Sequence, residues 1–159
     1  MDLDRIDFAI LDALAADGTL SNKELAAHID LAESTTLRRV RKLRDEGVIR
    51  GVHAQVDLRS IGVNLQAMVA VRLQKHSREL VEDFEDHIRD LPRVLSIFHV
   101  AGEYDYLVHV AVSDADELRD LALDAFTTRP EVEHLETSLI FEHTQTWTVP
   151  TSPMDRTDH

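Results

Sequence analysis

The sequence contains no cysteine, and this absence excludes several kinds of chemistry. Disulfides, cysteine-ligated zinc, iron–sulfur clusters and thiol catalysis all need that residue. The sequence also lacks an apolar run long enough to span a bilayer, and its acidic start, MDLDRIDFAI, does not have the basic and then continuously apolar pattern of a secretory signal. We therefore expect a cytoplasmic protein with no membrane partner.

Lysine is scarce as well, with three residues against thirty aspartates and glutamates, and the formal net charge is -13. The acidic excess lies mainly in the later part of the chain. Residues 1–50 carry a net charge of -2, and residues 51–159 carry -11. An acidic surface poor in lysine suits a cytoplasm rich in salt, where self-repulsion is screened. We interpret the composition as halophilic adaptation; an ordinary acidic soluble protein is the alternative.

Three helical patterns occupy the first fifty residues. Apolar residues recur every three or four positions over residues 4–16 and predict an amphipathic helix. Ser21 and Glu24 have the spacing of a capping box, which predicts the start of a second helix. After a short break, a third helix is expected to run to about Glu46. Two helices, a short turn and a further helix outline a helix-turn-helix domain, which we assign to residues 1–52.

The third helix concentrates positive charge. Five of the seventeen basic residues fall within the eight positions 37–44, LRRVRKLR. With about 100° per residue, the apolar back of this helix consists of Leu37, Val40 and Leu43. The opposite, cationic arc consists of Thr35, Arg38, Arg39 and Lys42. Such a front suits the major groove of double-stranded DNA, because arginine pairs with guanine edges or phosphates. A solvated charged face is the alternative, and the helix-turn-helix context favours DNA.

The pattern changes after a segment that we interpret as a linker with a hinge strand, residues 53–63. The β-prone stretch VIRGVHAQVD before and within it is expected to form a hairpin or wing. Beyond it, β-type runs at residues 65–74, 94–101, 104–112 and 132–143 alternate with helical runs at 77–90 and 114–127. The order β-α-β-β-α-β is typical of a ferredoxin-like domain, which we place at residues 64–147. The predicted fold class is α+β, with a flexible tail at residues 148–159.

The third of these strands, in YDYLVHVAV, points to self-association. Neither of its two alternating faces is convincingly polar. A four-stranded sheet with helices on one face shows polar residues on the other face unless that face is also covered. We therefore expect a homodimer that packs sheet to sheet and binds a pseudo-palindromic operator with half-sites about one helical turn apart.

Five motifs in order make the chain resemble the Lrp/AsnC (feast/famine) transcriptional regulators over residues 2–147. They are LDRID (3–7), IL..L..DG (10–18), SN.EL (21–25), RVRKL...GVI.G (39–51) and G.YDYL (102–107). The resemblance implies an N-terminal winged helix-turn-helix domain and a C-terminal ferredoxin-like βαββαβ (RAM) domain for assembly and amino-acid sensing. It also implies homodimers, with possible tetramers or octamers, and the composition adds the expectation of a halophilic archaeal source.

Two positions depart from the family pattern. Asp30-Leu31-Ala32 stands where the family usually has Gly-Leu-Ser before the third helix. Aspartate tolerates a left-handed turn, but Ala32 has no hydroxyl group to cap the helix. Glu103 stands where the family commonly has aspartate, which affects the size or polarity of the expected ligand.

The predicted site residues follow from the basic helix and the resemblance together. The DNA-binding surface is predicted at Ser34, Thr35, Arg38, Arg39 and Lys42. The predicted effector is a small amino acid, with no other cofactor. The turn AGEYDY is by itself only a hairpin turn, but with the resemblance it becomes a candidate pocket, because backbone N–H groups can take a carboxylate and acidic side chains an ammonium group. The predicted ligand-binding residues are Gly102, Glu103, Tyr104, Asp105, Thr137 and Ser138.

Nine histidines raise the question of a metal site. His99 and His109 could approach each other across a hairpin, while His134 and His143 are expected on the last strand. The sequence has no His-x-x-x-His spacing, and we predict no metal site.

Two other functions remain as alternatives to a ligand-responsive regulator. One is an architectural DNA-binding protein without a ligand. The other is a small ferredoxin-like enzyme that uses Asp105 or Glu103 with His99 as acid and base, although no nucleophile, phosphate loop or metal cluster accompanies these residues.

Overall fold

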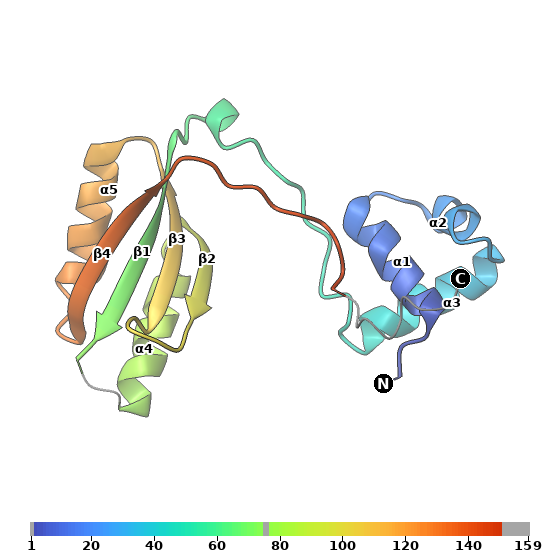
Figure 1. The fold of residues 1–159 in the computed structure, drawn as a ribbon, viewed down its shortest axis with the longest axis horizontal. Helices are drawn as coiled ribbons and strands as arrows, with labels where there is room; N and C mark the ends of the chain where they lie inside the picture. Colours follow the sequence, from blue (N-terminus) through green and yellow to red (C-terminus); the bar gives the residue numbers. More distant parts are fainter. Residues whose placement is uncertain (1, 75–76, 151–159) are drawn as a thin grey trace. The chain divides into compact units, whose positions relative to one another are not determined.

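The computed structural model describes residues 2–74 and 77–150, which form two compact units (Figure 1). The first unit contains residues up to Gln55 together with residues from Thr144 onward, and the second contains Val56–His143. The division at residue 55 falls inside the predicted linker. The last strand ends at Ile140, and residues from Thr144 onward are grouped with the first unit. The predicted bounds of the second domain, residues 64–147, stay a prediction. Of the predicted tail, residues 151–159 lie outside the described residues.

Three helices build the first unit: α1 (Arg5–Ala16), α2 (Asn22–His28) and α3 (Glu33–Asp45). Local sequence sets their starts. Asp4 caps α1 by accepting hydrogen bonds from the N–H groups of Ile6 and Asp7, and Asp7 returns a bond to the Asp4 N–H. The predicted capping box of α2 is confirmed, because Ser21 and Glu24 exchange the two expected bonds.

The turn between α2 and α3 fixes the helix-turn-helix. Asp30 has a φ of 54°, the left-handed conformation that replaces the usual glycine. Ala32 occupies the N-cap of α3 and makes no side-chain cap bond, as its missing hydroxyl predicts. The buried residues that join the three helices are Ile10, Ala13, Leu25, Val40 and Leu43.

The stretch at residues 48–57 forms no strand, contrary to the predicted wing hairpin and hinge strand. The regular secondary structure within the linker, residues 53–63, is limited to one 3-10 turn, Arg59–Ile61. A strand needs a second strand to pair with its backbone groups. Within the described part of this chain all strands belong to one sheet elsewhere, so the β-prone residues have no partner.

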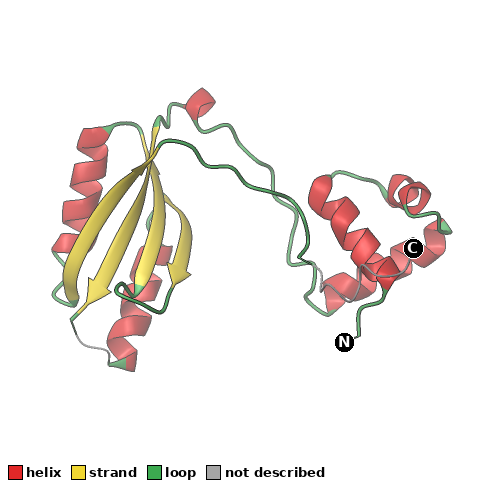
Figure 2. Ribbon diagram, viewed as in Figure 1, coloured by secondary structure: helices red, strands yellow, loops and turns green. Residues whose placement is uncertain are grey.

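The second unit is a four-stranded antiparallel sheet with two helices (Figure 2). Its strands are β1 (Leu65–Leu73), β2 (Val94–His99), β3 (Tyr106–Val112) and β4 (Val132–Ile140), in the spatial order β2-β3-β1-β4. The helices are α4 (Arg78–Arg89) and α5 (Ala115–Leu121), and α5 continues into a π-helical turn, Ala122–Thr127. The predicted α+β, ferredoxin-like fold is confirmed.

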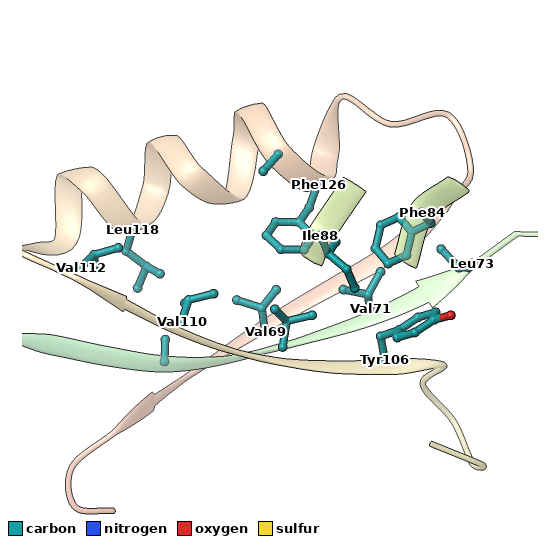
Figure 3. Close-up of a cluster of buried hydrophobic side chains, with 13 residues drawn as sticks. Val69, Val71, Leu73, Phe84, Ile88, Tyr106, Val110, Val112, Leu118 and Phe126 are labelled. Carbon is teal, nitrogen blue, oxygen red and sulfur yellow. The ribbon is translucent and has the colours of Figure 1, made fainter. Parts of the chain in front are cut away.

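Both helices pack on the same face of this sheet, where alternate residues of β1 and β3 meet Phe84, Ile88 and Phe126 (Figure 3). Tyr106, Val108, Val110 and Val112 of β3 are fully buried there. The other face, here called the open sheet face, carries Met68, Ala70, Leu107 and Ala111 at its centre, since these alternate with the core residues in the pairing register. None of the helices in residues 2–74 and 77–150 is long and apolar enough to cross a membrane.

Candidate nucleic-acid interface and ligand loop

Three residues form the buried face of α3. Thr36, Val40 and Leu43 are buried, and the Thr36 hydroxyl donates a 3.2 Å hydrogen bond to the Ala32 carbonyl oxygen. The sequence pattern placed Leu37 on this inner face. In the structure Leu37 is only half-buried, and Thr36 is buried in its place.

The outer face of α3 carries a groove lined by three basic and two acidic side chains, with a net positive charge. Its lining residues are Ser34, Leu37, Arg38, Arg41, Lys42, Asp45 and Glu46. We call this surface the α3 groove. Ser34, Arg38 and Lys42 were predicted for the DNA surface, whereas Arg41 was not. The sequence held one signal for Arg41: it follows Ser34 by seven residues, or two helical turns, which places both residues on the same face of the helix.

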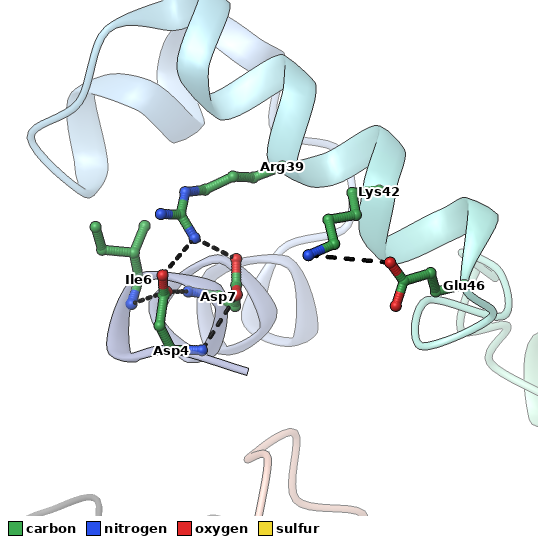
Figure 4. A network of polar contacts seen from close by, with 6 residues as sticks. All are labelled: Asp4, Ile6, Asp7, Arg39, Lys42 and Glu46. Atoms are coloured by element: carbon green, nitrogen blue, oxygen red, sulfur yellow. Dashed lines mark hydrogen bonds and ion pairs between the residues drawn. The ribbon is translucent and has the colours of Figure 1, made fainter. Parts of the chain in front are cut away.

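Arg39 lies on the flank of α3 that faces the start of α1 (Figure 4). Its Nη1 atom is 2.7 Å from Asp4 Oδ2 and 2.7 Å from Asp7 Oδ1. The side chain of Arg39 is 25% exposed and that of Asp7 is 11% exposed, so the ion pair is partly shielded from water. Thr35, the fifth predicted residue, is half-buried on the same flank.

Two pKa shifts reflect this network. The pKa of Asp4 lies below its usual value because the Asp7 N–H donates to its carboxylate and Arg39 adds a charged hydrogen bond. Hydrogen bonds to Asp7 and then Asp4 raise the pKa of Arg39. The guanidinium is thus held by the protein's own carboxylates.

The predicted ligand loop joins β2 to β3 and is anchored by Asp105. The carboxylate of Asp105 accepts a 2.8 Å hydrogen bond from the Leu73 N–H, and its own N–H donates to the Val71 carbonyl oxygen at 2.9 Å. Gly102 has a φ of 151°, a conformation that side-chain-bearing residues rarely adopt. These contacts fix the loop at the end of β1.

Tyr104 connects the loop to β4. Its hydroxyl donates to Glu136 Oε2, and its ring stacks on His134 with 6.2 Å between centroids. The bond to Glu136 raises the pKa of Tyr104. The loop therefore meets β4 at residues 134–136, which the sequence did not identify because the strand register is a property of the folded sheet. Thr137 and Ser138 lie further along β4, opposite Val69 and Met68.

The histidines do not converge as the sequence suggested. His99 pairs with Tyr106 and stacks on its ring at 4.6 Å, whereas His109 lies on the open sheet face. The Nε2 atom of His109 is 2.9 Å from Gln66 Oε1, and its ring is 5.3 Å from that of His143, which lies beyond the end of β4. The described residues hold no group of three or more potential metal ligands.

Comparison with known proteins identifies the families to which the two units belong. A winged helix-turn-helix DNA-binding family matches residues 3–50, and the Lrp/AsnC ligand binding domain matches residues 66–147. The chain belongs to the Lrp/AsnC family of transcriptional regulators. Members of this family are DNA-binding regulators and not enzymes, so the enzyme alternative is excluded. The two matched domains are a DNA-binding domain and a ligand-binding domain, so the partners of the chain are DNA and a small-molecule effector.

Individual Lrp/AsnC relatives cover nearly the whole chain. The HTH-type transcriptional regulator AldR of Mycolicibacterium smegmatis is 41% identical over 142 residues, which make up 89% of this chain and 83% of the relative. The Bkd operon transcriptional regulator of Pseudomonas aeruginosa is 36% identical over 86% of this chain and 90% of its own length. A transcriptional regulator of Neisseria meningitidis, solved as a complex with L-Met, superposes with a TM-score of 0.87 at 32% identity and covers 94% of this chain and 97% of its own.

Proposed function

We propose that this Lrp/AsnC regulator is a homodimer that binds a pseudo-palindromic operator and changes its assembly and DNA affinity when it binds a small amino acid. The observation that carries the proposal is the α3 groove, a cationic surface on the last helix of a helix-turn-helix in a chain whose net charge is -13. A surface that departs so far from the average charge of the chain fits an anionic partner.

The DNA half of the proposal assigns α3 to the major groove. Arginines of the α3 groove can pair with guanine edges or with phosphates, and Ser34 can contact either. Lys42 has Glu46 Oε1 3.9 Å away, an exposed pair that DNA phosphates can replace at little cost. Arg39 and Thr35 lie beside the α3 groove and are weaker candidates for contact.

The dimer half is supported by the open sheet face. Met68 and Leu107 are half-buried there, and Phe98, which pairs with Leu107, is 49% exposed. An apolar strip of this kind on a sheet without a second layer is stabilised when another sheet covers it. A second copy of the same face satisfies this requirement with two-fold symmetry, and two-fold symmetry of the dimer favours a pseudo-palindromic operator. Tetramers or octamers form from such dimers by further contacts.

The third part of the proposal is that an amino-acid effector binds at the β2–β3 loop. Backbone N–H groups near Gly102 suit the carboxylate of the effector, and the carboxylate of the exposed Glu103 suits its ammonium group. Tyr104, Asp105, Thr137 and Ser138 would line the remaining sides. The related regulator of Neisseria meningitidis in complex with L-Met supports an amino acid as the class of effector.

The experiment is a thermal-shift screen of the twenty amino acids at molar salt, followed by light scattering and DNA titration with the best ligand. A ligand that binds only the folded protein raises its melting temperature. We expect at least one amino acid to raise it and to change both the molecular mass of the assembly and its affinity for DNA. An architectural DNA-binding protein would instead bind DNA identically with and without all twenty, and that outcome would contradict the proposal.

A further inference from the structure

We propose that Leu37 reads a thymine methyl group in the operator, and that Arg39 positions α3 without contacting bases. The inference rests on the proposed function, since it takes α3 as the element that enters the major groove. It changes the set of reading residues that the sequence pattern predicted, because that pattern assigned Leu37 to the core and Arg39 to DNA.

Leu37 is an apolar side chain in a charged surface. It is half-buried and lines the α3 groove together with Ser34, Arg38 and Arg41. The partly buried apolar residues that pack on the core of this unit are Leu3, Ile6, Leu11, Leu14, Leu20, Ile29 and Ile49, and Leu37 is not one of them. The core therefore does not explain a leucine at this position.

The chemistry of the major groove offers one matching partner. The C5-methyl of thymine is the apolar group that base edges display there, beside hydrogen-bond donors and acceptors. Leu37 would bury this methyl, while Arg38 and Arg41, which line the same groove, pair with guanine or with phosphates. Leu37 and Arg41 are one helical turn apart, so their contacts are separated by about two base pairs. The inferred partner is a half-site in which a thymine has an arginine-contacted base or phosphate close beside it.

Arg39 lies beside that surface, in a neighbouring hollow that it lines with Asp2, Asp4, Asp7, Arg38 and Lys42. Its Nη1 atom bonds to Asp4 and Asp7 at 2.7 Å each, and neither Arg39 nor these carboxylates line the α3 groove. If Arg39 turned to DNA, it would leave the carboxylates of Asp4 and Asp7 without their cationic partner. Arg39 is therefore a positioning residue, which sets the orientation of α3 on α1.

Thymine-to-uracil substitution tests the Leu37 contact, because it removes only the methyl group. The probe is a duplex selected by the wild-type protein from a random-sequence pool, with each thymine replaced in turn by deoxyuridine. We expect one position in each half-site where the replacement weakens wild-type binding by about fourfold, the value for burying one methylene-sized group. Leu37→Ala should bind more weakly and lose sensitivity to uracil at that position alone.

Two further variants keep the test decisive if Leu37→Ala does not fold. Leu37→Gln keeps the size of the side chain without its apolar end and should also lose uracil sensitivity, whereas Leu37→Met should keep it. If Leu37→Gln or Leu37→Ala shows the same uracil effects as the wild type, the Leu37 assignment is wrong while the proposed function stands. If the wild-type protein selects no sequence from the pool, both are wrong.

The role of Arg39 is tested on the same duplex. Arg39→Ala should lower the melting temperature and weaken binding to selected and unrelated duplexes by the same factor, because the whole helix is displaced. A variant that melts like the wild type but loses preference for the selected duplex would make Arg39 a base-reading residue and overturn its positioning role.

Discussion

Arg39 Nη1 lies 2.7 Å from Asp7 Oδ1 although the two residues are 32 positions apart in the sequence. The contact joins α3 to the first turn of α1, where Asp7 also completes the capping box with Asp4. One arginine thus links the helix that is proposed to enter DNA to the start of the domain. Through this contact, one arginine of the basic run LRRVRKLR is paired with the protein's own carboxylates.

Replacing Arg39 with alanine should destabilise the N-terminal unit by about 1 to 2 kcal/mol, because Asp7 then remains largely shielded without its charged hydrogen-bond partner. Hydrogen exchange resolved by mass spectrometry should show faster exchange in α1 and α3. The matched control is Arg44→Ala, which removes the same charge from an exposed position of the same helix. Equal stability of the two variants would contradict a structural role for the Arg39 contacts.

The Asp4 carboxylate should make the N-terminal unit sensitive to acid. Its pKa in the folded protein lies below the unfolded value of 3.8, so the stabilisation is complete above that value and is lost as the pH falls through the folded pKa. Asp4→Asn keeps a good N-cap but carries no charge. Denaturation monitored between about pH 6 and pH 2 should show a smaller loss of stability for the variant. A pH dependence identical to that of the wild type would show that Asp4 contributes nothing to acid sensitivity.

Ala32→Ser should stabilise α3 by about 1 kcal/mol, because the N-cap of this helix has no side-chain hydrogen bond and a serine hydroxyl supplies one. Ala32→Val is the matched control, since valine adds bulk at the same exposed position without an acceptor. Chemical denaturation of the three proteins measures the difference. A serine variant no more stable than the valine variant would mean that the helix start is already satisfied in another way.

His109 should make the C-terminal unit less stable as the pH falls below neutral. Burial lowers the pKa of His109 below its ordinary value of 6.5, and the nearby His143 lowers it further. The unfolded chain therefore takes up a proton first, and stability that is present above pH 6.5 is lost below it. His109→Gln can still bond to Gln66 and should reduce this dependence between about pH 7.5 and pH 5. Denaturation curves at the two ends of that range check the prediction, and equal slopes for variant and wild type would contradict it.

Local sequence predicted the features that depend on neighbouring residues. Ser21 and Glu24 cap α2 as their spacing requires, and Asp30 adopts the left-handed turn that its position before α3 demands. The order of strands and helices also followed from pattern alone, because alternating and helical periodicities differ clearly along residues 65–140.

Features that depend on how elements meet in space were not predictable in the same way. Thr36 and Leu37 are neighbours on the helix, and Thr36 is the one that is buried. Which of two neighbouring residues is buried depends on tertiary packing, which periodicity alone does not give. The contact from Tyr104 to Glu136 depends on the register of β1 with both β3 and β4. The β-prone residues 48–57 form no strand, because a strand needs a partner strand to pair with its backbone groups. The local sequence does not tell whether such a partner lies close enough in the fold.

The most direct test of the proposed function is an anisotropy titration of a labelled duplex that the wild-type protein has selected. The titration compares the wild type with the double variant Arg38→Ala/Arg41→Ala. Arg44→Ala, another arginine-to-alanine change on the same helix, is the control. Arg38 and Arg41 line the α3 groove, and Arg44 does not. We predict that the double variant loses most of its preference for the selected duplex over an unrelated one, at an unchanged melting temperature, while Arg44→Ala keeps it. A double variant that discriminates between the two duplexes as well as the wild type would contradict DNA recognition by the α3 groove.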